Sequence, residues 1–537
     1  MAKHVRPQYL ILVSLVLGWI FDLLFWKKQI GISLPIFTVL IVIVGLWLAS
    51  RARLTPARNA VWLLVPIAFF ALVPIFRLEP FTRFTSAVVI FLLLAVFALS
   101  FLGGQWPRYG FADYVAKILG LVPNGLGLLR QPAGGPRKKE TGFSLRSLAP
   151  VGRGLLLALP LLWFLAVLLA SADPSFADWL NSVFAFLRID NAAEYLLRGF
   201  YILILAYILA AVYMVAFNKS RKEPLLGYEK PLIARALGFG EAATMLTSVN
   251  LLFAAFVVFQ FNYFFGGTAN IMKTPTFLTY SEYAVRGFWE LLVVSITSLV
   301  FFVAMSTISK RETGQKQRWF SGLGITLFAL VAVILTSAFE RLLLYERVYG
   351  FTRLRTYPHV FMIWLGVLLL VIVILEALGR RRAFALATAA AVVGFTATLA
   401  VINVDGMIVR ENINLIRAGQ DFQSSSPDRW TTALDYAYLG TLSDDAVPSL
   451  VDAYEMASAE GAAQLSEQIA TALTCHFEVI EKPSDLSWQS WNLSRQTASN
   501  LWKELKAEPE FLVIETTEQG TYFLGGEESS CYSLFWD

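Results

Sequence analysis

The chain has 537 residues, of which 57% are hydrophobic and only 15% are charged. A soluble domain carries about 25% charged residues, so this composition excludes an ordinary soluble globular protein. The formal net charge of +5 does not indicate a nucleic-acid partner, because most basic residues lie in short loops between apolar runs.

Separate apolar runs of about twenty residues predict an all-α polytopic membrane domain over residues 1–402. Lys27 and Lys28 directly follow the first run, with no small-residue cleavage site, so we expect an uncleaved span and not a signal peptide. About eleven transmembrane helices are predicted, at residues 9–26, 30–48, 61–76, 87–102, 151–170, 199–217, 242–265, 287–308, 319–338, 359–378 and 384–402.

Basic residues gather in every second loop of this arrangement. The five basic loops are 51–58, 108–146, 219–235, 310–318 and 380–382. The positive-inside rule then predicts a cytoplasmic N-terminus, and an odd number of spans places the C-terminal domain outside. Lys27, Lys28 and the cations of residues 341–355 do not follow the pattern.

The longest loop between predicted spans covers residues 105–150. Its segments PNGLG and QPAGGPRKKE are rich in glycine, proline and basic residues. This composition predicts a flexible cytoplasmic loop. Its cations are expected to lie next to anionic lipid.

Three charged residues begin the eighth predicted span. Glu282, Arg286 and Glu290 are four residues apart, so they share one line on a helix face. A charge inside the bilayer is costly unless it has a partner or reaches water. We therefore expect this line to face inward, toward Glu340 and Arg341 at the end of the ninth span.

Other charged residues fall at the same predicted outer level. Asp22 lies inside the first span, and Arg353 and Arg355 lie just before the tenth. One hypothesis is an outward-facing site that binds a polar or anionic group. The alternative is a set of salt bridges that join the span ends to the C-terminal tail, since charges at the interface reach water cheaply.

Several stretches resemble a known family. They include LGFGEA (237–242), NLLFAAFVVFQFNYFFGG (250–267), LTYSEYAVRGFWELL (278–292) and NVDGMIVRENI (403–413). These strings resemble a family of polytopic bacterial membrane proteins catalogued as a domain of unknown function. The resemblance implies a multi-pass protein of the bacterial plasma (inner) membrane. It brings no assigned reaction or catalytic residue.

Residues 403–537 differ in character, with a net charge of −15 against +20 for the rest of the chain. Helical periodicity over 410–418, 429–438, 444–457, 463–476 and 486–505 predicts a mainly helical extracytoplasmic domain. Ser443, followed by Asp444 and Asp445, is typical of a helix start. Residues 511–526 are predicted to form a strand pair.

Cys475 and Cys531 are the only cysteines, and both lie in the tail. An oxidising compartment on that side of the membrane would favour a disulfide between them. Two buried free thiols remain the alternative, because sequence gives no distance between the residues.

The chain carries no recognisable catalytic motif. Gly238 and Gly240 fit the pattern G-x-G-x-x-A, but they open a membrane span with no strand before it, so a dinucleotide site is not predicted. The three histidines are far apart and the two cysteines lack zinc-finger spacing. We predict no metal and no cofactor, and the absence of a motif favours a protein that is not an enzyme.

Three functions remain compatible with the sequence. The first is a membrane scaffold or sensor, surrounded by membrane lipids, whose outer domain binds a protein partner in the envelope. The second is a transporter or lipid-handling protein with an outward-facing polar cavity. The third, a membrane glycosyltransferase of the polyprenyl-phosphate-sugar type, is a poor match, because the first outer loop spans only about residues 27–29.

Overall fold

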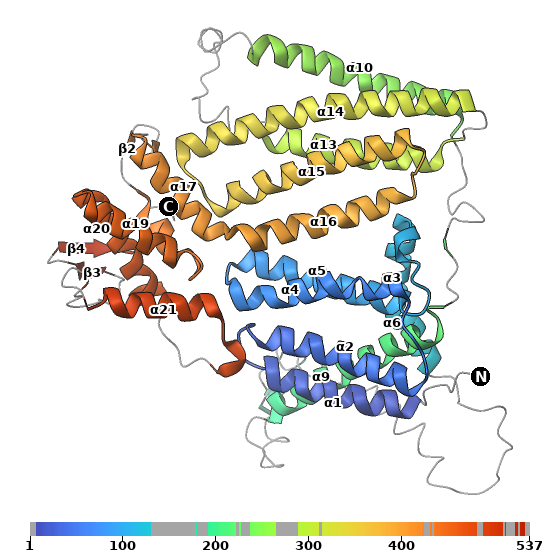
Figure 1. Cartoon of the computed structure of the whole chain (residues 1–537), viewed down its shortest axis with the longest axis horizontal. Helices are drawn as coiled ribbons and strands as arrows, with labels where there is room; N and C mark the ends of the chain where they lie inside the picture. Colours follow the sequence, from blue (N-terminus) through green and yellow to red (C-terminus); the bar gives the residue numbers. More distant parts are fainter. Residues whose placement is uncertain are drawn as a thin grey trace, which may run out of the picture.

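The structure is a computed structural model. It describes residues 7–129, 169, 173, 175–176, 178–179, 192–221, 225–226, 237–264, 288–310, 314–419, 422–423, 430–431, 434–480, 487–507, 511, 521–524 and 527–531. Long helices lie side by side, and a smaller helical domain packs against one end of them (Figure 1).

The first group of long helices comes from the N-terminal part of the chain. It consists of α1 (Pro7–Phe25), α2 (Ser33–Arg51), α4 (Leu64–Phe76), α5 (Pro80–Ser100), α6 (Phe111–Leu129) and α9 (Ala192–Asn218), with the short α3 (Arg58–Val61) and η1 (Trp106–Arg108) between them. Leu17, Phe37, Phe97 and Tyr213 are buried in their shared core. Helix α9 packs against both α1 and α6.

The second group consists of α10 (Phe239–Phe264), α13 (Phe288–Ile308), α14 (Gly314–Tyr349), α15 (Arg353–Ala377) and α16 (Ala383–Ile402). Phe302, Phe320 and Phe328 form the centre of its core. A Cβ atom on Gly324 would lie 2.1 Å from the Phe302 ring, so glycine is needed where α13 and α14 approach. The two groups meet where Ala400 of α16 packs against α4 and α5.

The long helices have the length and surface of membrane spans. Within the described residues, nine helices are long and apolar enough to cross a membrane, and Tyr9–Phe25 is a shorter apolar helix. Trp19, Phe91 and Leu251 are each exposed by 60% or more, as expected of apolar side chains that contact lipid. The protein is therefore a polytopic, multi-pass membrane protein.

Ten of the eleven predicted spans coincide with these ten helices. The remaining one, at residues 151–170, lies outside the described residues except for residue 169. The predicted flexible loop at 105–150 is wrong in its first part, because residues 111–129 form α6. Pro123 lies inside this helix, and Leu121 packs against α5 and α9, so apolar periodicity outweighed the loop-like string PNGLG. Residues 130–150 lie outside the described residues.

The C-terminal domain begins at a sharp bend. Asn403 takes a left-handed conformation (φ 57°), which asparagine tolerates, and its side chain accepts a hydrogen bond from the Gly406 N–H at 3.1 Å. The chain thus leaves α16 and starts α17 (Val404–Arg417). The domain continues with α18 (Tyr436–Gly440), α19 (Val447–Ala459), α20 (Ala463–Thr474), η3 (Cys475–Ile480), η4 (Trp488–Ser490) and α21 (Leu493–Leu505).

Two short antiparallel strand pairs complete the domain. They are β1 (Phe422–Gln423) with β2 (Trp430–Thr431), and β3 (Thr521–Leu524) with β4 (Glu527–Ser530). In place of the predicted helix at 429–438, the described residues form β2 and the start of α18. Strand β3 lies within the predicted pair at 511–526, and its partner β4 lies just beyond that range. Cys475 and Cys531 form a disulfide, with Cα atoms 5.4 Å apart. The domain core contains Leu450, Leu473 and Trp502.

Candidate functional site

The turn between α4 and α5 contains a buried glutamate. The Glu79 carboxylate accepts hydrogen bonds from the backbone N–H groups of Phe81 (2.8 Å) and Thr82 (2.6 Å). Pro80 takes the first helical position, where no N–H donor is needed. Tyr357 of α15 donates its hydroxyl to Glu79 Oε1 at 2.5 Å. One carboxylate therefore caps α5 and holds α15 beside it.

Asp445 of the C-terminal domain binds the same turn. Its Oδ2 accepts hydrogen bonds from the backbone N–H groups of Leu78 (2.7 Å) and Glu79 (3.0 Å). The Asn403 side chain donates to the Asp445 backbone oxygen at 2.9 Å. Asp445 is only 1% exposed, and burial raises the pKa of its carboxyl above the usual value. These contacts satisfy two buried backbone donors with a side chain from another domain.

A buried ion pair joins α15 to α17. The Arg353 guanidinium donates to Asp405 through Nε (2.8 Å) and Nη2 (2.5 Å), in the two-bond geometry that suits this pair. Asp405 is fully buried and also accepts from the Ser443 hydroxyl at 2.6 Å. The Tyr438 hydroxyl accepts from the Arg353 backbone N–H, and burial raises the pKa of Tyr438 to about 12, so this hydroxyl stays neutral.

We call Leu78, Glu79, Arg353, Asp405 and Asp445 the junction. Leu78 and Glu79 lie in the turn between α4 and α5, Arg353 is the first residue of α15, and Asp405 and Asp445 belong to the C-terminal domain.

A second ionic cluster supports the junction from inside the domain. Asp444 lies 2.8 Å from Nε2 of His476 and 3.2 Å from Nε of Arg495. The other ring nitrogen of His476 lies 3.1 Å from the Gly440 carbonyl oxygen. Both ring nitrogens therefore face oxygen acceptors. This cluster fixes the loop before α19, from which Asp445 extends toward the membrane helices.

A second attachment lies at α21. Asn492 caps α21 by accepting from the Arg495 N–H, and its amide nitrogen donates to the Pro74 carbonyl oxygen of α4 at 2.6 Å. The Ile32 N–H donates to the Trp491 carbonyl oxygen at 3.0 Å. A Cβ atom on Gly31 would lie 2.5 Å from that same oxygen, so the close approach requires glycine. Trp491 is 40% exposed, at the level where helix α2 begins.

Asp22, a predicted site residue, is buried in an ion pair. Its carboxylate accepts from Nε of Arg198 at 3.0 Å, with further short contacts to Arg198 Nη2 and the Tyr201 hydroxyl. Beside it, Trp26 and Lys27 both donate to Glu194 at 2.7 Å. Asp22 therefore joins α1 to α9.

The predicted inward line at the start of the eighth span is only partly described. Glu282 and Arg286 lie outside the described residues. Glu290 and Glu340 are exposed, against the expected inward orientation, and Arg341 is half-buried. The buried stripe of α13 runs through Phe288, Leu291 and Leu292 and continues at Ser295, so Glu290 falls on another face of the helix.

Arg355, the last predicted site residue, stabilises the connection between α14 and α15. Its guanidinium donates to the carbonyl oxygens of Tyr349 (2.8 Å) and Gly350 (2.5 Å) and lies 4.2 Å from the centre of the Tyr345 ring. Of the predicted residues, only Arg353 belongs to the junction. Asp405, Asp445 and Asn492 were missed as site residues, because their partners are hundreds of positions away or on other helices.

The junction has the chemistry of a structural coupling. Its carboxylates are occupied by backbone donors, tyrosines and an arginine. Within the described residues, no group of three or more histidine, cysteine, aspartate or glutamate side chains could hold a metal ion. The arrangement holds helix ends and the C-terminal domain in fixed relative positions.

Comparison with known proteins gives one family match. A family model described as "Domain of unknown function (DUF4153)" matches residues 64–453, from the start of α4 into α19. No curated protein and no solved structure matches the chain. The matched range contains all five junction residues. Since it covers well over half of the sequence, the chain belongs to this family of unknown function.

Proposed function

We propose that this protein is a membrane scaffold or sensor whose C-terminal domain binds a protein partner in the cell envelope. The observation that carries the proposal is the junction. The hydrogen bonds of Asp445 to the α4–α5 turn and the buried Arg353–Asp405 pair attach the domain to two pairs of membrane helices. A domain held in this way keeps a bound partner at a fixed place on the membrane, or passes its movement to the helices.

An acidic face is the surface we assign to the partner. Asp452, Glu455, Glu460 and Glu467 are exposed on α19, α20 and their connection. Met456 lies among them and is 44% exposed. Carboxylates around an exposed apolar side chain suit a basic partner surface with an apolar centre.

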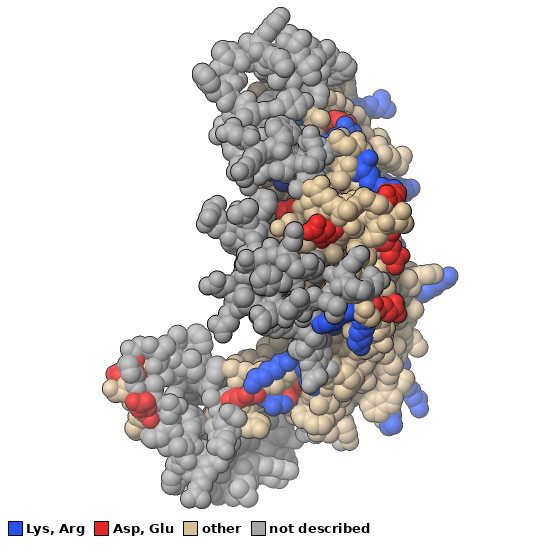
Figure 2. Space-filling view, turned by 90° about the vertical axis from the view of Figure 1, so that its left-hand side faces the viewer, with Lys and Arg blue, Asp and Glu red and all other residues tan. Residues whose placement is uncertain are grey.

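We further propose that the N-terminus is cytoplasmic, that the C-terminal domain is extracytoplasmic and that the membrane is the bacterial plasma membrane. Arg51, Arg58, Lys310 and Arg380 are exposed, and they lie at the end of α2, at the start of α3 and just after α13 and α15. These helix ends lie away from the C-terminal domain (Figure 1). At the domain end, acidic and basic residues are mixed (Figure 2). Here Lys27 pairs with Glu194 and Arg353 with Asp405, so two of the cations that depart from the positive-inside pattern have acidic partners.

The other hypotheses receive less support. A transporter needs polar groups through the opposite half of the membrane domain. There, Glu241 accepts from the Gly238 N–H at its own helix start, and Asn250 donates to the Leu323 carbonyl. Glu376 pairs with Arg381. These contacts give each residue a local structural role. The glycosyltransferase hypothesis rests on architecture alone.

Photo-crosslinking in cells tests the partner proposal. A photoreactive amino acid at Met456 should give one discrete protein adduct in the full-length protein. Glu455→Lys should suppress the adduct, because it reverses charge on the acidic face. Glu504→Lys is the matched control, an exposed glutamate on α21, and should leave the adduct unchanged. Absence of an adduct, or equal loss in both variants, would refute the partner surface.

A further inference from the structure

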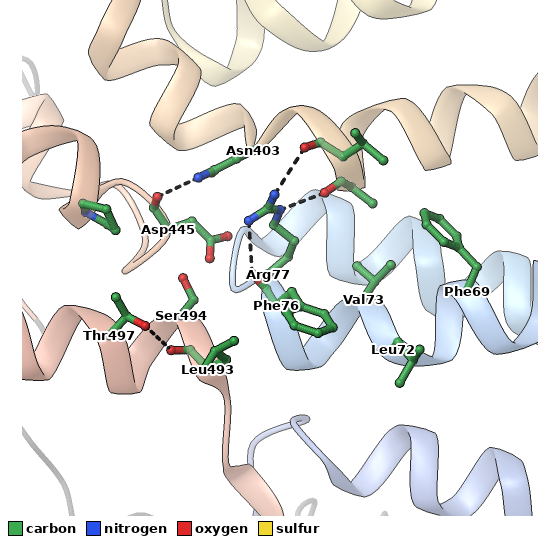
Figure 3. Close-up of a pocket in the computed structure, with 13 residues that line it drawn as sticks. Phe69, Leu72, Val73, Phe76, Arg77, Asn403, Asp445, Leu493, Ser494 and Thr497 are labelled. Carbon is green, nitrogen blue, oxygen red and sulfur yellow. Dashed lines mark hydrogen bonds between the residues drawn. The ribbon is translucent and has the colours of Figure 1, made fainter.

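A pocket of about 450 Å³ opens where α4, the end of α16 and the start of α21 meet (Figure 3). Its wall is apolar and faces outward: Phe69, Leu72, Phe76, Val401 and Leu493 are each 40–66% exposed. Phe69 and Phe76 lie on one helix about 10 Å apart, at roughly 1.5 Å per residue. The apolar wall therefore runs along the membrane helix over a distance that matches several methylene groups of an acyl chain.

Arg77 forms the polar end of this wall. Its guanidinium donates to the carbonyl oxygens of Ala400 (2.8 Å) and Val401 (3.2 Å), at the C-terminal end of α16, and to Phe76 (3.2 Å). An arginine side chain has five N–H donors, so these three bonds leave two donors available as far as the described residues are concerned. Arg77 is half-buried at the mouth of the pocket, where an anionic group can reach it.

Asp445 supplies the opposite charge. Its Oδ2 is used by the α4–α5 turn. Oδ1 is buried and makes no well-aligned hydrogen bond within the described residues, although the Ser494 hydroxyl interacts with the carboxylate. Figure 3 shows the carboxylate between Arg77 and the Ser494 side chain, on the inner wall of the pocket. A buried acceptor without a well-aligned donor is costly, so an added donor here would be stabilising.

We propose that this pocket binds one phospholipid that carries a protonated primary amine, with its phosphate at Arg77, its amine toward Asp445 and an acyl chain along the wall of α4. The side-by-side cation and anion match a zwitterionic head group better than an anionic one. The exposed apolar wall accounts for the acyl chain, which a soluble head-group compound lacks. Leu493 belongs to the C-terminal domain, so the lipid touches both sides of the attachment.

Native mass spectrometry of the full-length protein tests this assignment. The protein is purified in detergent and exposed to equal amounts of phosphatidylethanolamine and phosphatidylglycerol. We expect one phosphatidylethanolamine to be retained, with a preference of about tenfold, the effect of one charge-assisted hydrogen bond. Equal retention of the two lipids, or preference for phosphatidylglycerol, would overturn the proposal. Glycerophosphoethanolamine without acyl chains should not displace the lipid, and displacement would also overturn it.

Two substitutions locate the site. Val401→Trp fills the pocket and should abolish retention, whereas Val392→Trp introduces the same side chain at another exposed valine of α16 and should not. Asp445→Asn keeps an oxygen for the α4–α5 turn and should retain lipid but lose the preference for the amine. Retention in Val401→Trp equal to that in Val392→Trp would refute the site. The readout is bound lipid, so the inference stands or falls independently of the protein partner proposed above.

Discussion

Asp445 accepts a hydrogen bond from the backbone N–H of Glu79 at 3.0 Å, although 366 positions separate the two residues. The contact joins the turn between two membrane helices to the loop between α18 and α19 of the acidic domain. Because Asp445 also faces Arg77, the same carboxylate belongs to the attachment and to the pocket.

The Arg353–Asp405 pair should contribute strongly to stability. Asp405→Asn leaves the arginine without its counter-charge in a buried place, and we expect a loss of about 3 kcal/mol or more in the free energy of unfolding. Glu460→Gln is the matched control, since Glu460 and Arg417 form an exposed pair that contributes about 1 kcal/mol or less. Chemical unfolding in detergent micelles measures both. Equal losses in the two variants would contradict a larger contribution of the buried pair to stability.

Asp445 should make stability depend on pH. Burial raises its carboxyl pKa, so the folded protein binds this proton more tightly than the unfolded chain does. This contribution to stability is fully present below about pH 3.9, the pKa of an aspartate in the unfolded chain. It is lost as the pH rises through the higher pKa of Asp445 in the folded protein. The Ser494 hydroxyl, the backbone N–H groups of Glu79 and Leu78, and the Arg77 guanidinium act against burial and lower this pKa.

The variant Asp445→Asn cannot lose this proton. Its unfolding temperature, relative to the wild type, should therefore rise as pH increases from about 4. Thermal unfolding of both proteins, followed by tryptophan fluorescence across that range, measures the difference. A difference that is constant with pH would show that Asp445 does not titrate as described.

Gly31 should be needed for the contact between α2 and the domain. Gly31→Ala places a Cβ atom 2.5 Å from the Trp491 carbonyl oxygen and should cost about 1–3 kcal/mol. In Gly127→Ala the new Cβ meets nothing within 4 Å, and alanine should be neutral or stabilising in that helix. Limited proteolysis near residues 487–493 should increase only in Gly31→Ala. Unchanged cleavage would argue against this attachment.

The disulfide should stabilise the domain. Cys475 and Cys531 are 56 positions apart, and closing such a loop contributes about 4 kcal/mol in the chain-entropy model. Reduction, or Cys475→Ser with Cys531→Ser, should lower the free energy of unfolding of the domain by about that amount, and its unfolding temperature should fall. Maleimide labelling before and after reduction reports the bond. Labelling of unreduced protein taken directly from cells would contradict its formation there.

Sequence predicted the membrane helices well because apolar length is a local property. Sequence also selected Asp22 as a candidate binding residue because it lies inside a span, but it could not name Arg198, with which the structure pairs it. Four-residue spacing correctly places residues on one line, but it does not say which side of the helix the line faces. For that reason Glu290 was assigned to the wrong face.

The junction could not be predicted in the same way. Asp445 follows Ser443 in a pattern typical of a helix start, yet it binds a turn in another part of the fold, and Ser443 donates to Asp405. Only the packed domain brings these residues together. The string PNGLG similarly indicated a loop, whereas packing against α9 keeps it within α6.

Hydrogen exchange at the α4–α5 turn tests the central claim most directly. In the full-length protein, the amides of Leu78 and Glu79 should exchange slowly, because Asp445 accepts both hydrogen bonds. In Asp445→Ala, these two amides should exchange at least about tenfold faster, while amides within α4 remain protected. Rapid exchange of Leu78 and Glu79 in the wild type, or no change in the variant, would contradict a C-terminal domain fixed to the membrane helices.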